Sequence, residues 1–193
     1  MSDSNAFSSL TSAVSTRDQI LNATMVCLIH HGPKGTNISS IATQANVSRP
    51  TVYAYFETLP ELLQEAISRG TQLLCQSITE HARSQPTAED RLVAAFEHIL
   101  SLSQQVDVLR QPMSFHLPDT DRDVLPDEAI IAARQVLAHL LDDLSGDDDQ
   151  LNEMAETAVR FFLSLAAFKR PLGRDADIAG YVRRVILPAM GLA

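Results

Sequence analysis

The sequence predicts an all-α protein of about nine helices. Apolar residues recur at spacings of three and four along most of the 193-residue chain, and no segment alternates as a half-buried strand does. The composition is that of an ordinary globular protein, with 45% hydrophobic and 20% charged residues. A chain of this length can bury the core of one domain or of two small ones.

The N-terminal segment, residues 1–14, is rich in serine and is expected to be a flexible tail. It has neither the basic region nor the apolar stretch of a signal peptide, and no apolar run in the chain reaches the roughly 18–20 residues that cross a bilayer. We therefore expect a cytoplasmic protein without a membrane partner. Cys27 and Cys75 lie in apolar helical patterns and are expected to be small buried residues, not a disulfide framework.

The first predicted helix covers residues 16–31. Ser15 or Thr16 is a suitable N-cap, and Ile20 begins a stripe of apolar residues at helical spacing. Gly32 and the proline after it form a stop signal, because glycine favours the end of a helix and proline cannot continue one. The helix is therefore expected to end at this pair.

A second, shorter helix of two turns is predicted from Ile38. Asn46 is expected to break it, because asparagine tolerates the left-handed backbone conformation better than most residues do. Val47 then fills the turn with an apolar side chain. These features predict a tight turn between two short helices.

The third helix is expected to begin after Ser48. Because Pro50 has no N–H, the Ser48 hydroxyl has to accept a hydrogen bond from the N–H of Thr51. Val52 and Phe56 are spaced to face the core, on the side opposite the polar residues of this helix.

Longer helices follow. The first opens with a capping box from Thr58 to Glu61 and contains a proline in its first turn. A loop or a broken helix is expected at residues 111–126, which hold three prolines. The predicted long helices cover residues 59–83, 88–110, 127–144, 150–169 and 175–190.

Residues 159–168 are apolar almost all round. One core face cannot absorb so many apolar side chains, so a second face is expected to meet a partner subunit. The last helix offers a complementary stripe, which is formed by Ile178, Val182, Val185, Ile186 and Met190. The alternative is a central core helix of a monomer.

Sequence motifs for catalysis or metal binding are absent. The acidic triplet at Asp119, Asp121 and Asp123 lacks the glycine and the distal glutamate of a calcium loop. No HExxH, GxSxG or clustered cysteine and histidine pattern occurs. We therefore expect no catalytic residues, no metal and no cofactor.

The net charge of −9 is unevenly distributed. Residues 1–60 carry three basic and three acidic side chains, net 0, whereas residues 61–193 carry 12 basic and 21 acidic side chains, net −9. Only the first part can approach a polyanion without strong repulsion. This asymmetry suggests two functions on one chain.

The two short helices at residues 38–56 are typical of a helix-turn-helix. The outer side of the second one carries Arg49, Thr51, Tyr53 and Tyr55, whose hydroxyl and guanidinium groups suit phosphate oxygens and base edges. The alternatives are an ordinary corner between two helices and, for Tyr53, a half-buried aromatic residue that supports the first helix.

The segment 17–65 also carries a characteristic series of residues. They are Arg17, Ile20, Leu21, Ala23, Gly32, Thr36, Ile41, Ala42, the run Ala45-Asn46-Val47-Ser48-Arg49-Pro50-Thr51-Val52-Tyr53, then Tyr55, Phe56 and Leu62. In this order they closely resemble the N-terminal domain of the tetracycline-repressor (TetR) family. The resemblance implies a homodimeric transcription regulator, commonly a repressor, which leaves its double-stranded DNA operator when a small molecule enters the C-terminal domain.

The resemblance also implies a DNA-binding surface. Side chains that would enter or flank the major groove, or cap the helix that enters it, are Ser48, Arg49, Pro50, Thr51, Tyr53 and Tyr55. Side chains that would hold phosphate at the start of the preceding helix are Thr36 and Ser39 or Ser40. The chain departs from the family pattern at Asn46, where glycine is usual, and at Leu59, where a phosphate-binding lysine is common.

The predicted domains are the tail at residues 1–14, a DNA-binding domain at 15–60, and a ligand-binding and dimerisation domain at 61–193. Candidate walls of a ligand cavity are the apolar and imidazole side chains of Phe96, His98, Leu102, Met113, Phe115, His116, Phe161 and Phe162. The alternative function is that of an all-α small-molecule-binding protein or enzyme that does not bind DNA.

Overall fold

The computed structural model describes residues 15–105, 127–141, 148–167 and 177–192. Every regular element in these ranges is a helix, so the predicted all-α class is confirmed. Two compact units are present, Met1–Ile67 and Ser68–Ala193. No helix in the described ranges is long and apolar enough to cross a membrane.

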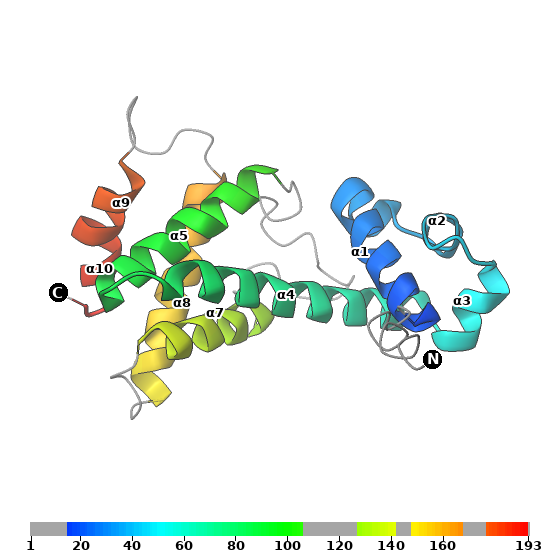
Figure 1. Ribbon diagram of the computed structural model, residues 1–193. Coiled ribbons are helices and arrows are strands. Elements are labelled where there is room, and N and C mark those ends of the chain that lie inside the picture. The colour runs from blue at the N-terminus through cyan, green and yellow to red at the C-terminus, as the bar shows by residue number, and fades with distance from the viewer. Residues whose placement is uncertain (1–14, 106–126, 142–147, 168–176, 193) are drawn as a thin grey trace, which may run out of the picture. The chain divides into compact units, whose positions relative to one another are not determined.

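The first unit contains α1 (Thr16–Gly35), α2 (Ile38–Gln44), α3 (Arg49–Tyr55) and the start of α4 (Leu59–Arg83), as Figure 1 shows. The N-cap of α1 is Ser15, whose hydroxyl accepts from the N–H of Asp18. The backbone at Gly32 leaves the helical conformation, with φ at 66° and ψ at 175°. The predicted stop at Gly32 is therefore a break, after which one more turn extends to the end of α1.

The turn between α2 and α3 has the predicted conformation. Asn46 adopts a φ of 54°, in the left-handed region where asparagine is better tolerated than most residues. The N–H of Val47 donates to the carbonyl oxygen of Ala42 at 3.0 Å, and its side chain packs against the core of the first unit. The turn thus places the start of α3 directly after α2.

A single apolar core holds the first unit together. Val52 is fully buried and Phe56 is 1% exposed, as their spacing predicted. The other buried residues of this cluster are Ile20, Leu21, Cys27, Leu28, Ile38, Ile41, Ala42, Leu62 and Ala66. Because helices as short as α2 and α3 are unstable alone in water, this shared core has to stabilise them.

The start of α4 differs from the predicted capping box in one bond. The hydroxyl of Thr58 accepts from the N–H of Glu61 at 3.3 Å, as expected. The carboxylate of Glu61 accepts from the N–H of Glu57 at 3.1 Å, not from that of Thr58. The second hydrogen bond of the capping box therefore forms one residue earlier, at Glu57. It ties the loop before α4 to the first turn of the helix.

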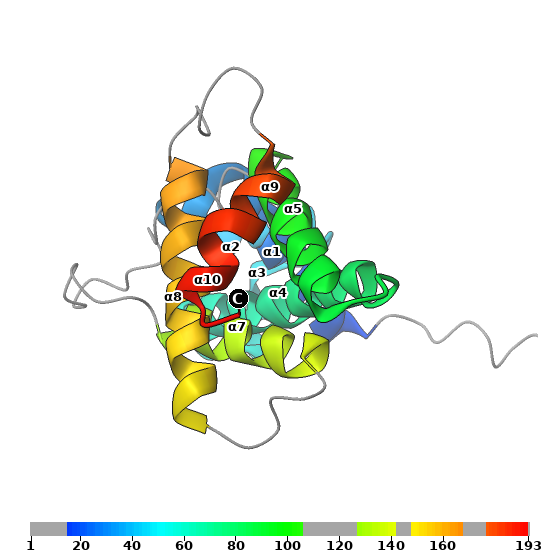
Figure 2. The same ribbon diagram turned by 90° about the vertical axis from the view of Figure 1, so that its left-hand side faces the viewer.

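The second unit is a helical bundle built around one apolar cluster. Helix α8 lies against α7 and also contacts α5 and the C-terminal helices, as Figures 1 and 2 show. After α4, its elements are α5 (Ala88–Gln105), α7 (Asp127–Leu140), α8 (Asp148–Ala167), α9 (Ile178–Tyr181), the π-helical segment η1 (Val182–Ile186) and α10 (Leu187–Ala189).

The predicted helix over residues 175–190 is helical from Ile178 to Ala189, but it contains a π-helical segment that the sequence analysis did not foresee. In η1 the N–H of Leu187 donates to the carbonyl of Val182, five residues back, as in a π-helix. Val182 and Ile186 are fully buried and Met190 is 4% exposed, all within the core of their own chain. Most of the C-terminal apolar stripe that was expected to face a partner subunit is therefore buried in the core of its own chain. Val185 is the exception, since it is 37% exposed.

Two histidines stack where α4 and α5 meet in the second unit. The rings of His81 and His98 lie 4.4 Å apart between centroids, with 10° between their planes. The Nε2 atom of His98 is 2.9 Å from the hydroxyl oxygen of Ser77. Burial lowers the pKa of His98 from its ordinary value of 6.5, and the charge of His81 lowers it further.

We predict that replacing Asn46 changes stability according to the left-handed preference of the new residue. Asn46→Ala should lower the free energy of unfolding by about 1 kcal/mol, because a Cβ disfavours this conformation and alanine has no side-chain amide to compensate. Asn46→Gly should leave it unchanged or raise it. Urea unfolding of the three proteins measures both differences, and equal stability of the alanine and glycine variants would contradict the argument.

We also predict that His98 makes the protein less stable in weak acid. Because the folded state depresses its pKa, the unfolded chain takes up the proton first, and the free energy of unfolding falls as the pH drops below about 6.5. Urea unfolding at about pH 7.5 and about pH 5.5 should show a smaller loss for His98→Gln than for the unmodified protein.

Thr87 and Arg183 lower the pKa of Asp90, so this carboxylate stays charged throughout that interval and loses its contribution only in stronger acid. An equal loss of stability in the His98→Gln variant and the unmodified protein would assign the acid sensitivity to other groups.

Candidate nucleic-acid interface

Helix α3 begins with a hydroxyl cap. The Ser48 Oγ atom accepts from the N–H of Thr51 at 3.2 Å and lies 2.7 Å from the Thr51 hydroxyl oxygen. Pro50 occupies the first turn, where its missing N–H costs no helical hydrogen bond. The predicted cap is confirmed, and it places two hydroxyl groups beside the N-terminus of the helix.

The two sides of α3 differ sharply in chemistry. Val52 is fully buried on one side, whereas Tyr53 is 50% exposed and Tyr55 is 45% exposed. Arg49 and Pro50 are also exposed. The outer surface of α3 therefore offers a guanidinium and two phenol groups, which are donors suited to base edges and phosphates.

The residues at the start of α2 have distinct roles. Thr36 is 4% exposed, and its hydroxyl donates to the carbonyl of Gly32 at 2.8 Å. The hydroxyl of Ser40 donates to the carbonyl oxygen of Asn37 and accepts from its N–H. The hydroxyls of Thr36 and Ser40 are thus engaged in hydrogen bonds within the loop, whereas Ser39 is exposed. Phosphate binding by these three residues stays a prediction.

The N-cap of α2 is Asn37, which the sequence analysis missed. Its Oδ1 accepts from the N–H groups of Ser39 and Ser40, both at 3.0 Å, and completes a capping box with Ser40. An asparagine directly before an apolar periodic run is a recognised N-cap signal. The neighbouring hydroxyl residues obscured that signal, because each of them also suits a cap.

Cations around α3 are few. Lys34 and Arg49 are exposed, whereas Arg17 forms an ion pair with Glu65. Leu59, at the position where the family often has lysine, is partly buried and packs against the core of the first unit. The exposed polar groups on and around α3 are therefore hydroxyls and phenols more than cations.

Two of the predicted ligand residues belong to the apolar cluster of the second unit or pack against it. Phe96 is 6% exposed, Phe161 packs against the same cluster, and His98 contacts Ser77. The side chains of Leu102 and Phe162 are partly buried. The remaining candidates, Met113, Phe115 and His116, lie outside the described residues.

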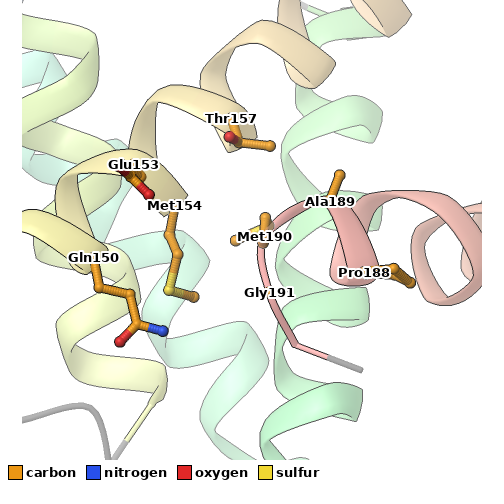
Figure 3. Close-up of a pocket in the computed structure, with 8 residues that line it drawn as sticks. All are labelled: Gln150, Glu153, Met154, Thr157, Pro188, Ala189, Met190 and Gly191. Carbon is orange, nitrogen blue, oxygen red and sulfur yellow. The ribbon is translucent and has the colours of Figure 1, made fainter.

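A pocket of about 320 Å³ lies between α8 and the C-terminal residues, and Figure 3 shows its lining. None of the predicted ligand residues in the described ranges lines it. Its lining residues are Gln150, Glu153, Met154, Thr157, Pro188, Ala189, Met190 and Gly191. In the part of the chain that the structure describes, no three potential metal ligands cluster.

Two short helices joined by a tight turn, with a buried inner side and a polar outer side on the second, define a helix-turn-helix protein. Residues 20–66 match the family of bacterial regulatory proteins named after tetR. Residues 20–66 are therefore a DNA-binding domain of the TetR family, and the chain that carries this domain is a transcriptional regulator, not an enzyme. This domain sets aside the alternative of a protein that does not bind DNA.

Similar proteins support the same class. An uncharacterized HTH-type transcriptional regulator, MT1294 of Mycobacterium tuberculosis (strain CDC 1551 / Oshkosh), is 27% identical over 91% of this chain and 88% of its own length. Solved structures of low identity share the fold. SCO7518 of Streptomyces coelicolor A3(2) has a TM-score of 0.69 and 18% identity, over 91% of this chain and 98% of that one.

A second structure is that of FadR from Thermus thermophilus, a TetR-family transcriptional repressor in complex with lauroyl-CoA. Its TM-score is 0.57 with 23% identity, over 90% of this chain and 92% of that one. About nine tenths of the chain, including the C-terminal bundle, therefore shares its fold with these two structures.

We predict that Ser48→Ala destabilises the start of α3 by about 1 kcal/mol, because the N–H of Thr51 loses its acceptor. Hydrogen exchange at the α3 amides should become faster. Ser48→Thr is the matched control, since it retains the capping oxygen, and it should behave as the unmodified protein does. Unchanged exchange in the alanine variant would mean that the cap does not stabilise α3.

Proposed function

We propose that the protein is a homodimeric repressor that binds a palindromic operator through α3 and leaves it when a small molecule binds the C-terminal domain. The observation that supports this most strongly is the outer surface of α3, where Arg49, Tyr53 and Tyr55 are exposed beside a hydroxyl-capped helix start. In this proposal residues 15–60 bind DNA and residues 61–193 bind the effector and form the dimer. It acts in the cytoplasm, where its DNA would lie.

Each exposed group has a role in the proposed complex. Arg49 is suited to bidentate recognition of guanine in the major groove, since its planar guanidinium presents two parallel donors. Tyr53, Tyr55 and the hydroxyls of Ser48 and Thr51 contact base edges or phosphates. Lys34 and Ser39 contact phosphate, and Lys34 adds one cation to the set predicted from the sequence. Thr36 and Ser40, the other members of that set, hold the loop that presents these two side chains.

A dimer would suit the expected operator. Two-fold symmetry places two copies of α3 in successive major grooves, about one helical turn apart, and so favours a palindrome. The surface that supports a dimer includes the partly buried Phe161 and Phe162 of α8 and the exposed Val185. Because most of the C-terminal stripe is buried in its own chain, α8 provides more of this surface than the sequence suggested.

The effector is proposed to be an amphipathic or apolar small molecule. The candidate walls for it are the apolar and imidazole side chains of Phe96, His98, Leu102, Phe161 and Phe162 in the second unit, none of which lines the pocket of Figure 3. Acyl-CoA thioesters are the first probes, because the Thermus thermophilus relative is a complex with lauroyl-CoA. Uncharged fatty esters are the second, because the net charge of −9 over residues 61–193 opposes a polyanionic ligand.

The test of the proposal is a comparison of two cation variants on DNA. An operator selected from genomic fragments and a random duplex are titrated by fluorescence polarisation. Arg49→Ala should cost about 1–3 kcal/mol on the operator and relax the preference at one base pair. Lys34→Ala is the control and should weaken binding to both duplexes equally, because phosphate contacts carry no sequence information.

Equal affinity of the unmodified protein for the operator and the random duplex would reject the proposal of a sequence-specific repressor. Unchanged operator affinity in Arg49→Ala would remove this side chain from the interface.

A further inference from the structure

Three helices of the first unit meet at the guanidinium of Arg17, in the first turn of α1. Its Nη1 and Nη2 atoms donate to the two carboxylate oxygens of Glu65, at 2.5 Å and 2.6 Å, in a bidentate ion pair. Its Cζ atom lies 4.9 Å from the ring centroid of Phe56. The Arg17 side chain, which belongs to α1, therefore contacts both the end of α3 and α4.

Phe56 connects this ion pair to the recognition helix. It is the C-cap of α3, and its N–H donates to the carbonyl of Val52 at 3.0 Å. Its ring is 1% exposed, so it cannot move without disturbing the core. The guanidinium of Arg17 covers this ring, which is a favourable arrangement of a cation on an aromatic face.

The ion pair has a two-point geometry, although its side chains are 46% exposed at Arg17 and 34% exposed at Glu65. A single-point pair between flexible side chains contributes little, whereas a planar fork on a carboxylate has a defined geometry. The hydrogen bond that Arg17 donates to Glu65 raises the pKa of Arg17, and the charges of Asp18 and Glu61 act in the same direction. Arg17 therefore stays positively charged in this ion pair.

We propose that the Arg17–Glu65 ion pair is a positioning contact that sets the orientation of α3 for sequence reading, through the ring of Phe56. The inference rests on the proposed function of α3 in DNA binding. A helix of seven residues cannot define its own direction, so contacts at its two ends have to do so. Ser48 fixes the start, and Phe56 under Arg17 fixes the end.

Electrostatics and positioning predict opposite effects for Glu65→Gln. Removing a negative charge, and freeing Arg17 for phosphate, would strengthen binding to any duplex if charge alone mattered. If the pair positions α3, the operator is bound more weakly and the random duplex is not. The sign of the change on the operator therefore separates the two explanations.

The experiment uses the full chain, the selected operator and a random duplex of equal length. Glu65→Gln should weaken operator binding about threefold or more, in the range of coupling between contacting residues, with no loss on the random duplex. Glu57→Gln is the matched control, because Glu57 is exposed and its loss removes the same charge without touching Arg17. It should leave both affinities unchanged or slightly stronger.

Melting curves accompany the titrations. If Glu65→Gln is not fully folded at the assay temperature, Arg17→Lys is used instead, since lysine retains the charge but not the bidentate fork, and it should show the same selective loss on the operator. Operator affinity that is unchanged or stronger in a folded variant overturns the inference alone. Failure of the unmodified protein to prefer the operator overturns the proposed function, and the inference with it.

Discussion

The burial of Val52 and Phe56 is the constraint on which the DNA-binding unit depends. Helix α3 has seven residues, fewer than a helix needs to be stable alone in water. Its inner side is therefore held by the apolar core that α1, α2 and the start of α4 share. Because that core fixes one side of α3, the opposite side is free to present polar groups without loss of the fold.

The ends of α3 are fixed by polar contacts that complement the core. At its start, Ser48 satisfies a backbone N–H that has no helical partner. Before it, Asn46 accepts a left-handed backbone that keeps the turn short. At its end, Phe56 lies under the guanidinium of Arg17, which Glu65 holds in place. Core and ends together give α3 a single orientation, which sequence-specific recognition requires.

Local chemistry explains which features could be predicted from the sequence. The Ser48 cap, the Asn46 turn and the inward side of α3 follow from rules that involve residues within a few positions. The ion pair of Arg17 and Glu65 spans 48 residues, and only the folded core brings its partners together. The π-helical segment was missed because its apolar spacing also fits an α-helix. The ligand residues stay a prediction, since apolar side chains of a core and of a cavity share one sequence pattern.

The central claim is that the surface of α2 and α3 contacts DNA, and hydrogen exchange of the full chain with and without its selected duplex tests it most directly. Bound DNA should slow exchange of the backbone amides at residues 36–55 and at the start of α4, with a random duplex giving a weaker effect in the same places. Slowed exchange that is confined to the second unit, or no change at residues 36–55 when the duplex is bound, would contradict the account.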